Sequence, residues 1–189
     1  MRPPASPDYS QVLYMRDANG DGKVDKANSS SLDQIRHATY DIAMAGGYFV
    51  TGFRSTCWGG YRNPPDGFIL DDPIDDPWEE QVRQVHDLFT SLEWWKLEPS
   101  DHLLTTTATG CYCLAEPGRQ YVVYVRGARK MSVTLEAGGT YQLERFDPRS
   151  GRRAKQGVLS GGEQEIETPD TGDHLFVLFR ISPGKGDAR

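Results

Sequence analysis

Oxygen-bearing side chains recur at fixed spacing near the N-terminus, in Asp17-Ala18-Asn19-Gly20-Asp21-Gly22-Lys23-Val24-Asp25-Lys26-Ala27-Asn28. They fall at positions 1, 3, 5, 9 and 12 of a twelve-residue loop, with Gly22 where the loop must turn. Ca²⁺ takes about six to eight hard oxygen ligands in a flexible cage, and a backbone carbonyl supplies the ligand at position 7. The spacing therefore predicts a calcium site made of Asp17, Asn19, Asp21, Lys23, Asp25 and Asn28.

This stretch resembles the calcium loop of EF-hand and dockerin repeats, and it departs from them at the closing position. An EF-hand has a bidentate glutamate there and a dockerin usually has an aspartate, whereas Asn28 offers one neutral oxygen. Dockerins carry two copies of the loop, and this sequence carries one. A turn rich in Asp, Asn and Gly that binds no metal is the alternative interpretation.

A second candidate site follows the apolar run at residues 48–53, which has the composition of a buried strand. Arg54, Trp58 and Tyr61 lie just after that run. Loops that leave the carboxyl ends of parallel strands commonly carry binding sites. We therefore expect these three residues to bind substrate, with Trp58 or Tyr61 stacking on a sugar ring. The alternative is that Trp58 packs the loop onto the strand, and the aspartates at 66–76 are expected to be solvated.

Composition narrows the class of protein. The chain has 189 residues and a formal net charge of −6, which argues against nucleic acid as a partner. No apolar run reaches the roughly 20 residues of a membrane helix, and residues 1–7 lack the apolar stretch of a signal peptide. Three cysteines do not make a disulfide framework, so Cys111 and Cys113 are expected to be small packing residues on one face of a strand.

The N-terminal half has the pattern of strand–helix units. Residues 12–15 form a short apolar strand, and residues 31–45 have helical spacing. The apolar stripe of that helix is Ile35, Ala38, Ile42 and Ala45, and Gly46-Gly47 ends it. Together with the strand at 48–53, these segments complete a βαβ unit.

A second helix begins at Asp76-Pro77-Trp78-Glu79, where Asp caps, Pro takes the first helical position and Glu79 completes a capping box. Its apolar stripe is Trp78, Val82, Val85, Phe89 and Leu92, and His86 lies beside the stripe on the helix surface.

Residues 92–104 mark the change from helix to strand patterns. Trp94 and Trp95 are adjacent and so point in different directions, and Pro99 forbids helix continuation. We interpret the stretch as a joint at which the two indoles pack against two different bodies. Trp95→Ala is then expected to remove a buried aromatic, which costs about 3–5 kcal/mol, and to uncouple the two units.

The C-terminal half has short strand candidates at 111–114, 120–126, 130–135, 140–147 and 174–181, and one or two more at 157–168. Pro and Gly turns separate them, including Ala137-Gly138-Gly139 and Asp147-Pro148-Arg149-Ser150-Gly151. Strands of this length and spacing predict an antiparallel β-sandwich. Among its side chains there is no Ser/His/Asp, Cys/His or zinc arrangement.

Several motifs together resemble the C-terminal part of apiosidase-like glycoside hydrolases. They are Leu92-Glu93-Trp94-Trp95-Lys96-Leu97-Glu98-Pro99, Gln120-Tyr121-Val122-Val123-Tyr124-Val125, Arg145-Phe146-Asp147-Pro148-Arg149-Ser150-Gly151, Thr168-Pro169 and His174-Leu175-Phe176-Val177-Leu178. Upstream, residues 35–40, Gly46-Gly47 and Trp58 resemble that family's last barrel helix–strand–loop passage. The family pairs a (β/α)₈ barrel with a small β-sandwich labelled collagen-binding, and the resemblance covers roughly residues 32–181.

The resemblance implies an α+β chain: residues 1–99 are the C-terminal remnant of a (β/α)₈ barrel, 100–183 a β-sandwich and 184–189 a tail. It also implies a retaining-type pair of carboxylates on barrel strands. The first is expected to be missing because a barrel needs about 250 residues. Where the second should stand, the sequence has Met15-Arg16-Asp17.

The expected function is therefore that of the C-terminal portion of a carbohydrate-active protein, without its catalytic pair and inactive as an isolated chain. Its implied partners are a plant or bacterial polysaccharide and the missing N-terminal part of the barrel, and the parent family implies a secreted or periplasmic location. The alternative is a non-catalytic module that binds polysaccharide or an extracellular matrix protein. Neither nucleic acid nor a membrane is expected as a partner.

Overall fold

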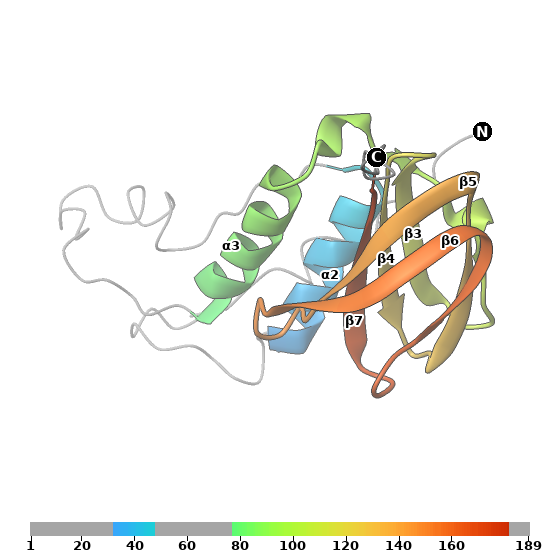
Figure 1. Ribbon diagram of the computed structural model, residues 1–189. Helices are drawn as coiled ribbons and strands as arrows, with labels where there is room; N and C mark the ends of the chain where they lie inside the picture. Colours follow the sequence, from blue (N-terminus) through green and yellow to red (C-terminus); the bar gives the residue numbers. More distant parts are fainter. Residues whose placement is uncertain (1–31, 48–76, 182–189) are drawn as a thin grey trace, which may run out of the picture.

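A computed structural model describes residues 32–47 and 77–181. Two helices, α2 (Leu32–Met44) and α3 (Pro77–Thr90), precede an antiparallel sheet (Figure 1). The strands are β1 (Glu98–Pro99), β2 (Leu104–Thr105), β3 (Gly110–Glu116), β4 (Gln120–Arg126), β5 (Lys130–Phe146), β6 (Arg153–Glu167) and β7 (Asp173–Arg180). The fold is thus α+β and rich in strand, as expected. Within the described ranges, no helix is long and apolar enough to cross a membrane.

The sheet is continuous rather than divided into two separate sheets. Its strand order is β1-β3-β4-β7-β5-β2, and β6 pairs with β5 alone. The last strand, β7, is inserted between β4 and β5, so residues near 175 pair with residues near 124 and 146. The strands predicted at 111–114, 120–126 and 174–181 are confirmed as β3, β4 and β7.

One long strand replaces the two predicted at 130–135 and 140–147. The β5 strand pairs with β2 near Val133 and with β7 from Tyr141 onward, so its two halves lie beside different strands of the sheet. The stretch predicted as a turn is an irregularity between Leu135 and Thr140, where Gly138 has a φ of 73°. A left-handed glycine bends the strand there without ending it.

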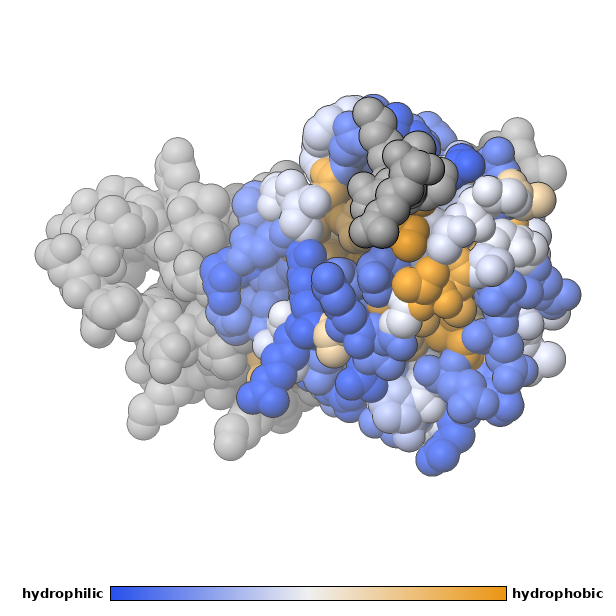
Figure 2. All heavy atoms as spheres, in the orientation of Figure 1, coloured by the Kyte–Doolittle hydropathy of each residue, from blue (hydrophilic) through white to orange (hydrophobic). Residues whose placement is uncertain are grey.

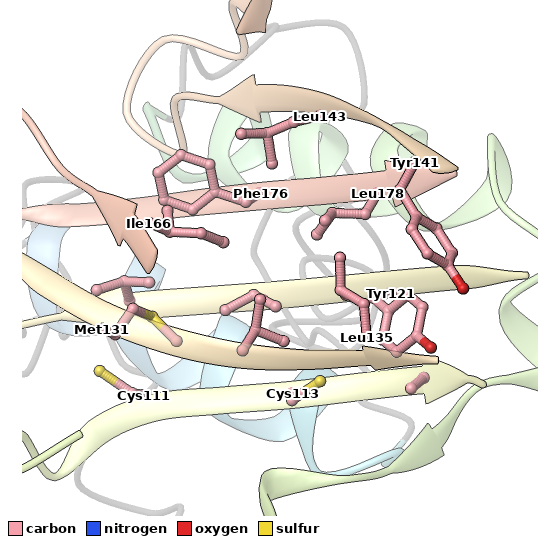
Figure 3. Packing of buried hydrophobic residues seen from close by; sticks show 14 of the residues in the cluster. Cys111, Cys113, Tyr121, Met131, Leu135, Tyr141, Leu143, Ile166, Phe176 and Leu178 are labelled. Atoms are coloured by element: carbon pink, nitrogen blue, oxygen red, sulfur yellow. The ribbon is translucent and has the colours of Figure 1, made fainter. Parts of the chain in front are cut away.

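One face of the sheet is covered by the β5–β6 ribbon, which crosses it in front in Figure 1. Alternate side chains of β3, β4 and β7 point into this first core, among them Cys113, Tyr121 and Phe176 (Figure 3). Tyr121 and Tyr141 meet edge to face with centroids 5.5 Å apart. Cys111 and Cys113 are buried free thiols on one face of β3, as predicted. Burial is the main cause that raises the pKa of the Cys113 thiol to about 12.

The other face of the sheet is covered by the two helices. Leu114, Val122 and Val177 point into this second core, where Tyr40 of α2 and Leu88 of α3 meet them. The Tyr40 and Tyr124 rings are stacked with centroids 5.1 Å apart, and Tyr112 continues the stack at 6.4 Å. Because neighbouring residues of each strand alternate between faces, the same strands build both cores.

The predicted stripe of α2 is wrong for most of its members. Ile35 is buried, but Ala38 and Ile42 are half-buried and Ala45 is exposed. The buried residues are Ile35, Arg36, Thr39, Tyr40, Ala43 and Met44. A stripe chosen from apolar residues alone leaves out Arg36 and Thr39. In the structure, the ion pair of Arg36 and the stacking of Tyr40 orient this face of the helix toward the sheet. The predicted end of the helix is confirmed, since Gly46 has a φ of 71° and the Gly47 N–H donates to the Ile42 carbonyl.

The helix predicted from Pro77 is confirmed as α3, but its buried face is shifted. Val85 and Leu92 are buried as expected, Val82 and Phe89 are half-buried, and Leu88 is fully buried. Two glutamines, Gln81 and Gln84, also turn inward. His86 is exposed, which confirms its position on the helix surface.

The predicted role of Trp95 at the joint is wrong. Its side chain is 62% exposed, and Trp94 is half-buried. Leu92 and Leu97 fill the second core at this point instead. After Lys96 the chain is extended, as expected where Pro99 forbids helix continuation, and Glu98 and Pro99 pair with Ala115 and Leu114 of β3.

The Asp147-to-Gly151 motif is a turn that joins β5 to β6. The Asp147 carboxylate accepts hydrogen bonds from the Arg149 N–H at 2.9 Å and the Ser150 hydroxyl at 3.0 Å. Gly151 closes the turn with a φ of 67° and lies against Gln84 of α3. This motif of the family resemblance therefore has a structural role here.

Candidate functional site

An apolar groove of about 720 Å³ lies between the end of α2, the outer face of α3 and the connection that leads to β1. Most of the residues that line it lie near helix ends or in short turns. It is lined by Ala43, Ala45, Gly46, Gly47, Val82, Val85, His86, Phe89, Thr90, Trp94, Trp95, Leu97, Glu98, Pro99 and Leu114. A groove of this volume and composition is typical of a binding site for a small molecule or a short chain segment.

Local sequence explains how the walls of the groove are placed. The left-handed Gly46 brings the end of α2 beside Pro99, which lies 3.5 Å from where a Cβ of residue 46 would stand. On α3, Val82, His86 and Phe89 lie at i, i+4 and i+7 and so share one face. The short 3₁₀ turn η3 (Trp94–Lys96) then carries both tryptophans to the rim.

The two tryptophans give the groove an exposed aromatic surface. Their rings meet edge to face with centroids 6.1 Å apart. Trp94 is half-buried beside the second core, while Trp95 is open to solvent. A solvent-facing indole held against a second ring is a rigid apolar platform, and the apolar face of a sugar ring or another aromatic ring can stack on it.

The polar groups of the groove do not suit glycoside hydrolysis. Of its lining residues, Glu98 alone carries a carboxylic acid. Hydrolysis through a carboxylate pair needs two acids about 5–9 Å apart. His86 lies 3.3 Å from the Asp87 carboxylate and is exposed, and the Thr90 hydroxyl donates to the His86 carbonyl. The described residues that line this groove therefore contain no such pair.

A second cavity of about 490 Å³ holds a network of charges instead of a reactive pair. Glu93 and Glu116 both lie near Arg119, at 3.6 and 3.7 Å, and Lys96 contacts Glu93 at 2.8 Å. The hydrogen bond from Lys96 lowers the pKa of Glu93, which therefore stays ionised at neutral pH. A general acid needs a raised pKa, so Glu93 does not have the character of one.

A buried ion pair joins α2 to β7. The guanidinium of Arg36 donates to both oxygens of Asp173, at 2.6 and 2.9 Å, and both side chains are almost fully buried. Burial opposes ionisation of Asp173, but the hydrogen bond and charge of Arg36 outweigh it and lower the pKa of that carboxyl. His37 lies 3.8 Å from the same carboxylate. This cluster holds the helix on the sheet.

The residues that the sequence singled out as sites lie outside the described part of the chain. This holds for Arg54, Trp58 and Tyr61 and for the predicted calcium loop at residues 17–28. Both remain predictions. Within residues 32–47 and 77–181, no group of three or more His, Cys, Asp or Glu side chains is arranged to hold a metal ion.

Sequence reasoning missed the groove because it assigned Trp95 to the interior. The signal was present in the pattern: Leu92 and Leu97 flank Glu93, Trp94, Trp95 and Lys96. In a single 3₁₀ turn, two leucines and one tryptophan can fill the space toward the sheet, and the adjacent tryptophan must then point away.

Comparison with known proteins gives similarity in fold. No family model matches the sequence, and no curated protein matches it. A solved glycoside hydrolase superposes with a TM-score of 0.63 at 15% identity over 79% of this chain. A glycoside hydrolase family 5 structure from Bacteroides vulgatus superposes with a TM-score of 0.63 at 14% identity, also over 79%.

The chain spans little more than a third of each of these structures, 37% of the first and 36% of the second. This chain therefore has the fold of one part of these glycoside hydrolases.

Proposed function

We propose that this chain is the C-terminal portion of a carbohydrate-active, glycoside hydrolase-like protein. In this proposal α2 and α3 belong to the last units of a (β/α)₈ barrel, and the sheet is an accessory module packed on the barrel end. The observation that carries the proposal is the likeness in fold to two glycoside hydrolases over 79% of the chain. The apiosidase-like motifs support it, and the turn at Asp147 to Gly151 shows how one of them joins the sheet to α3.

The proposal includes the absence of a catalytic pair from the chain. The two cavities of the described residues support it, since one contains Glu98 as its single carboxylic acid and the other neutralises its glutamates with Arg119 and Lys96. We expect no hydrolysis of pectic glycosides by the 189-residue chain above a heat-denatured control. Robust release of reducing sugar would overturn the claim that the pair is missing.

The alternative function is that of a non-catalytic binding module for polysaccharide or an extracellular matrix protein, and the exposure of Trp95 favours it specifically. Affinity electrophoresis in gels that contain pectin, cellulose or collagen tests it. We expect retardation by a polysaccharide, which Trp95→Ala removes. Leu32→Ala is the matched control, because Leu32 is also exposed, at 40%, but lies at the start of α2 and does not line the groove. Equal mobility in all gels would exclude this function.

Arg54, Trp58 and Tyr61 remain proposed contacts for the same carbohydrate, and a secreted or periplasmic location is proposed with the family. Mobility of Trp58→Ala in the polysaccharide gel distinguishes a contact at that loop from one at Trp95. Retardation of both variants equal to that of the wild type contradicts both contacts.

Calcium is proposed at Asp17, Asn19, Asp21, Lys23, Asp25 and Asn28. The missing glutamate at the closing position predicts weak affinity, about 10⁻⁴–10⁻³ M, as in extracellular modules. Calorimetric titration and melting temperature at millimolar calcium test the site, because a ligand that binds the folded state stabilises it. A rise in melting temperature that survives Asp21→Ala would place the ion elsewhere.

A further inference from the structure

The longest free edge of the described sheet belongs to β6. Within residues 32–47 and 77–181, β6 pairs with β5 on one side and with no strand on the other. Most of its side chains are exposed, including Val158 at 54%. Figure 1 shows β6 as the outer strand of the β5–β6 ribbon, and Figure 2 shows a hydrophobic area on the face that this ribbon crosses. An open edge of this length is a template for pairing with another strand.

The charges along β6 are segregated by sign. The first part carries Arg153 and Lys155, directly after Arg152. The last part carries Glu163, Glu165 and Glu167. Lys130 of β5 contacts Glu165 at 3.0 Å and Glu167 at 2.7 Å. One lysine does not balance three glutamates, so this end of the strand keeps a net negative charge. The edge therefore has a positive end and a negative end.

A strand with this charge pattern is complementary to itself in antiparallel orientation. If a second β6 is turned about an axis through Ser160, the basic segment 153–155 of each copy faces the acidic segment 163–167 of the other. Val158 then stands opposite Gly162, which leaves room for its side chain. A parallel arrangement in the same register would oppose like charges, which is destabilising.

We propose that two copies of this chain pair through their β6 edges in a two-fold antiparallel arrangement centred on Ser160, which joins their sheets. Backbone hydrogen bonds supply the attraction, and the two charged ends set orientation and register. The irregularity of β6 at Gln156 and the left-handed Gly162 divide the edge into segments, and the charged segments 153–155 and 163–167 are the ones that meet.

Charge reversal tests the arrangement on the full chain. Sedimentation of the wild type up to about 0.5 mM should show a dimer that weakens as salt rises to about 1 M. Lys155→Glu and Glu165→Lys should each raise the dissociation constant at least about tenfold. An equimolar mixture of the two variants should form a heterodimer, because each chain then offers the charge that the other lacks. The exposed α3 substitutions Arg83→Glu and Asp87→Lys are matched controls that should not affect association.

Position-specific crosslinking tests the centre. In a Cys57→Ser background, Ser160→Cys should form an intermolecular disulfide, because the axis brings residue 160 of each copy beside its counterpart. The exposed Thr134→Cys should not. A wild type that stays monomeric at every concentration overturns the proposal. A dimer that both charge variants form as tightly as the wild type also overturns it, and so does a dimer in which Ser160→Cys does not crosslink. The mixture and the crosslink do not depend on loss of folding in a variant.

Discussion

Side chains of one type take different roles here according to what lies next to them. Trp94 and Trp95 are neighbours in the chain, yet one rests against the second core and the other is 62% exposed. Arg36 is buried because Asp173 meets its guanidinium with both oxygens, whereas Arg83 forms its ion pairs in solvent. Burial at the residue scale follows from the available partners more than from hydropathy.

The exposure of Trp95 predicts a small effect of its removal on stability. Trp95→Ala should change the free energy of unfolding by less than about 1 kcal/mol, because an exposed side chain leaves no cavity. Leu97→Ala, at a side chain that is 7% exposed, should cost about 2–5 kcal/mol. Urea denaturation compares the two variants. A larger loss for Trp95→Ala than for Leu97→Ala would contradict the structure.

The buried ion pair predicts a defined dependence of stability on pH. Asp173→Ala removes the buried partner of Arg36 and leaves it the largely exposed Asp33 at 2.8 Å, which should cost about 3–5 kcal/mol. Because the pKa of Asp173 is lowered in the folded state, the pair's contribution is complete above its ordinary value of about 3.9. The contribution is then lost as the pH falls through the lower folded pKa. Urea denaturation at pH values between about 5 and 2 measures this loss.

The double variant Arg36→Met/Asp173→Leu is the control for this prediction. Without either charge no buried group is left unpaired, so it should be more stable than Asp173→Ala. It should also lose less stability between pH 5 and 2 than the wild type does. Equal acid sensitivity of the wild type and the double variant would assign the effect to other carboxylates.

At the scale of elements, turns fix how the layers meet. The turn between β5 and β6 lies against α3, so a change in it affects packing between layers as well as the local backbone. The Asp147 carboxylate holds the turn through the Arg149 N–H and the Ser150 hydroxyl. Despite partial burial, these hydrogen bonds lower the pKa of Asp147.

Two glycines separate the backbone effect from the packing effect. Gly151 and Gly127 both have left-handed φ values, 67° and 81°. A Cβ at Gly127 would meet nothing within 4 Å, whereas one at Gly151 would lie 3.2 Å from Gln84. Each alanine substitution should cost about 1–2 kcal/mol for the backbone, and Gly151→Ala should cost more. Thermal denaturation of both variants measures the difference, and equal costs would show that Gln84 moves aside freely.

At the scale of the whole molecule, both cores share one sheet. Cys113 and Phe176 face the β5–β6 ribbon, while their neighbours Leu114 and Leu175 face the helices. Neither core can open without exposing strands of the other. The described elements therefore form one cooperative unit.

A single unfolding transition should follow from the shared sheet. Thermal unfolding monitored by far-ultraviolet circular dichroism and by tryptophan fluorescence should give the same midpoint, as for a two-state domain. Trp94 and Trp95 report on the helical side, and the dichroism reports mainly on the strands. Two separate midpoints would restore the interpretation of residues 92–104 as a joint between independent units.

The sequence predicted local features of this fold more successfully than contacts between layers. Pro77 and Gly46 mark helix ends by their own backbone preferences, so both ends were predicted correctly. The continuity of β5 and the burial of Arg36 depend on strands and side chains far away in the sequence. The groove was missed for the same reason, because the exposure of Trp95 depends on how Leu92 and Leu97 fill the second core.

The position of β7 between β4 and β5 has a consequence for synthesis on the ribosome. Residues 120–146 are translated well before residues 173–180, yet their strands find a common neighbour only when the latter emerge. Until then one edge of β4 and part of β5 carry unpaired backbone groups, which are open to association with other chains. A nascent chain halted before residue 173 is therefore expected to bind chaperones, and its release should coincide with the emergence of the last strand.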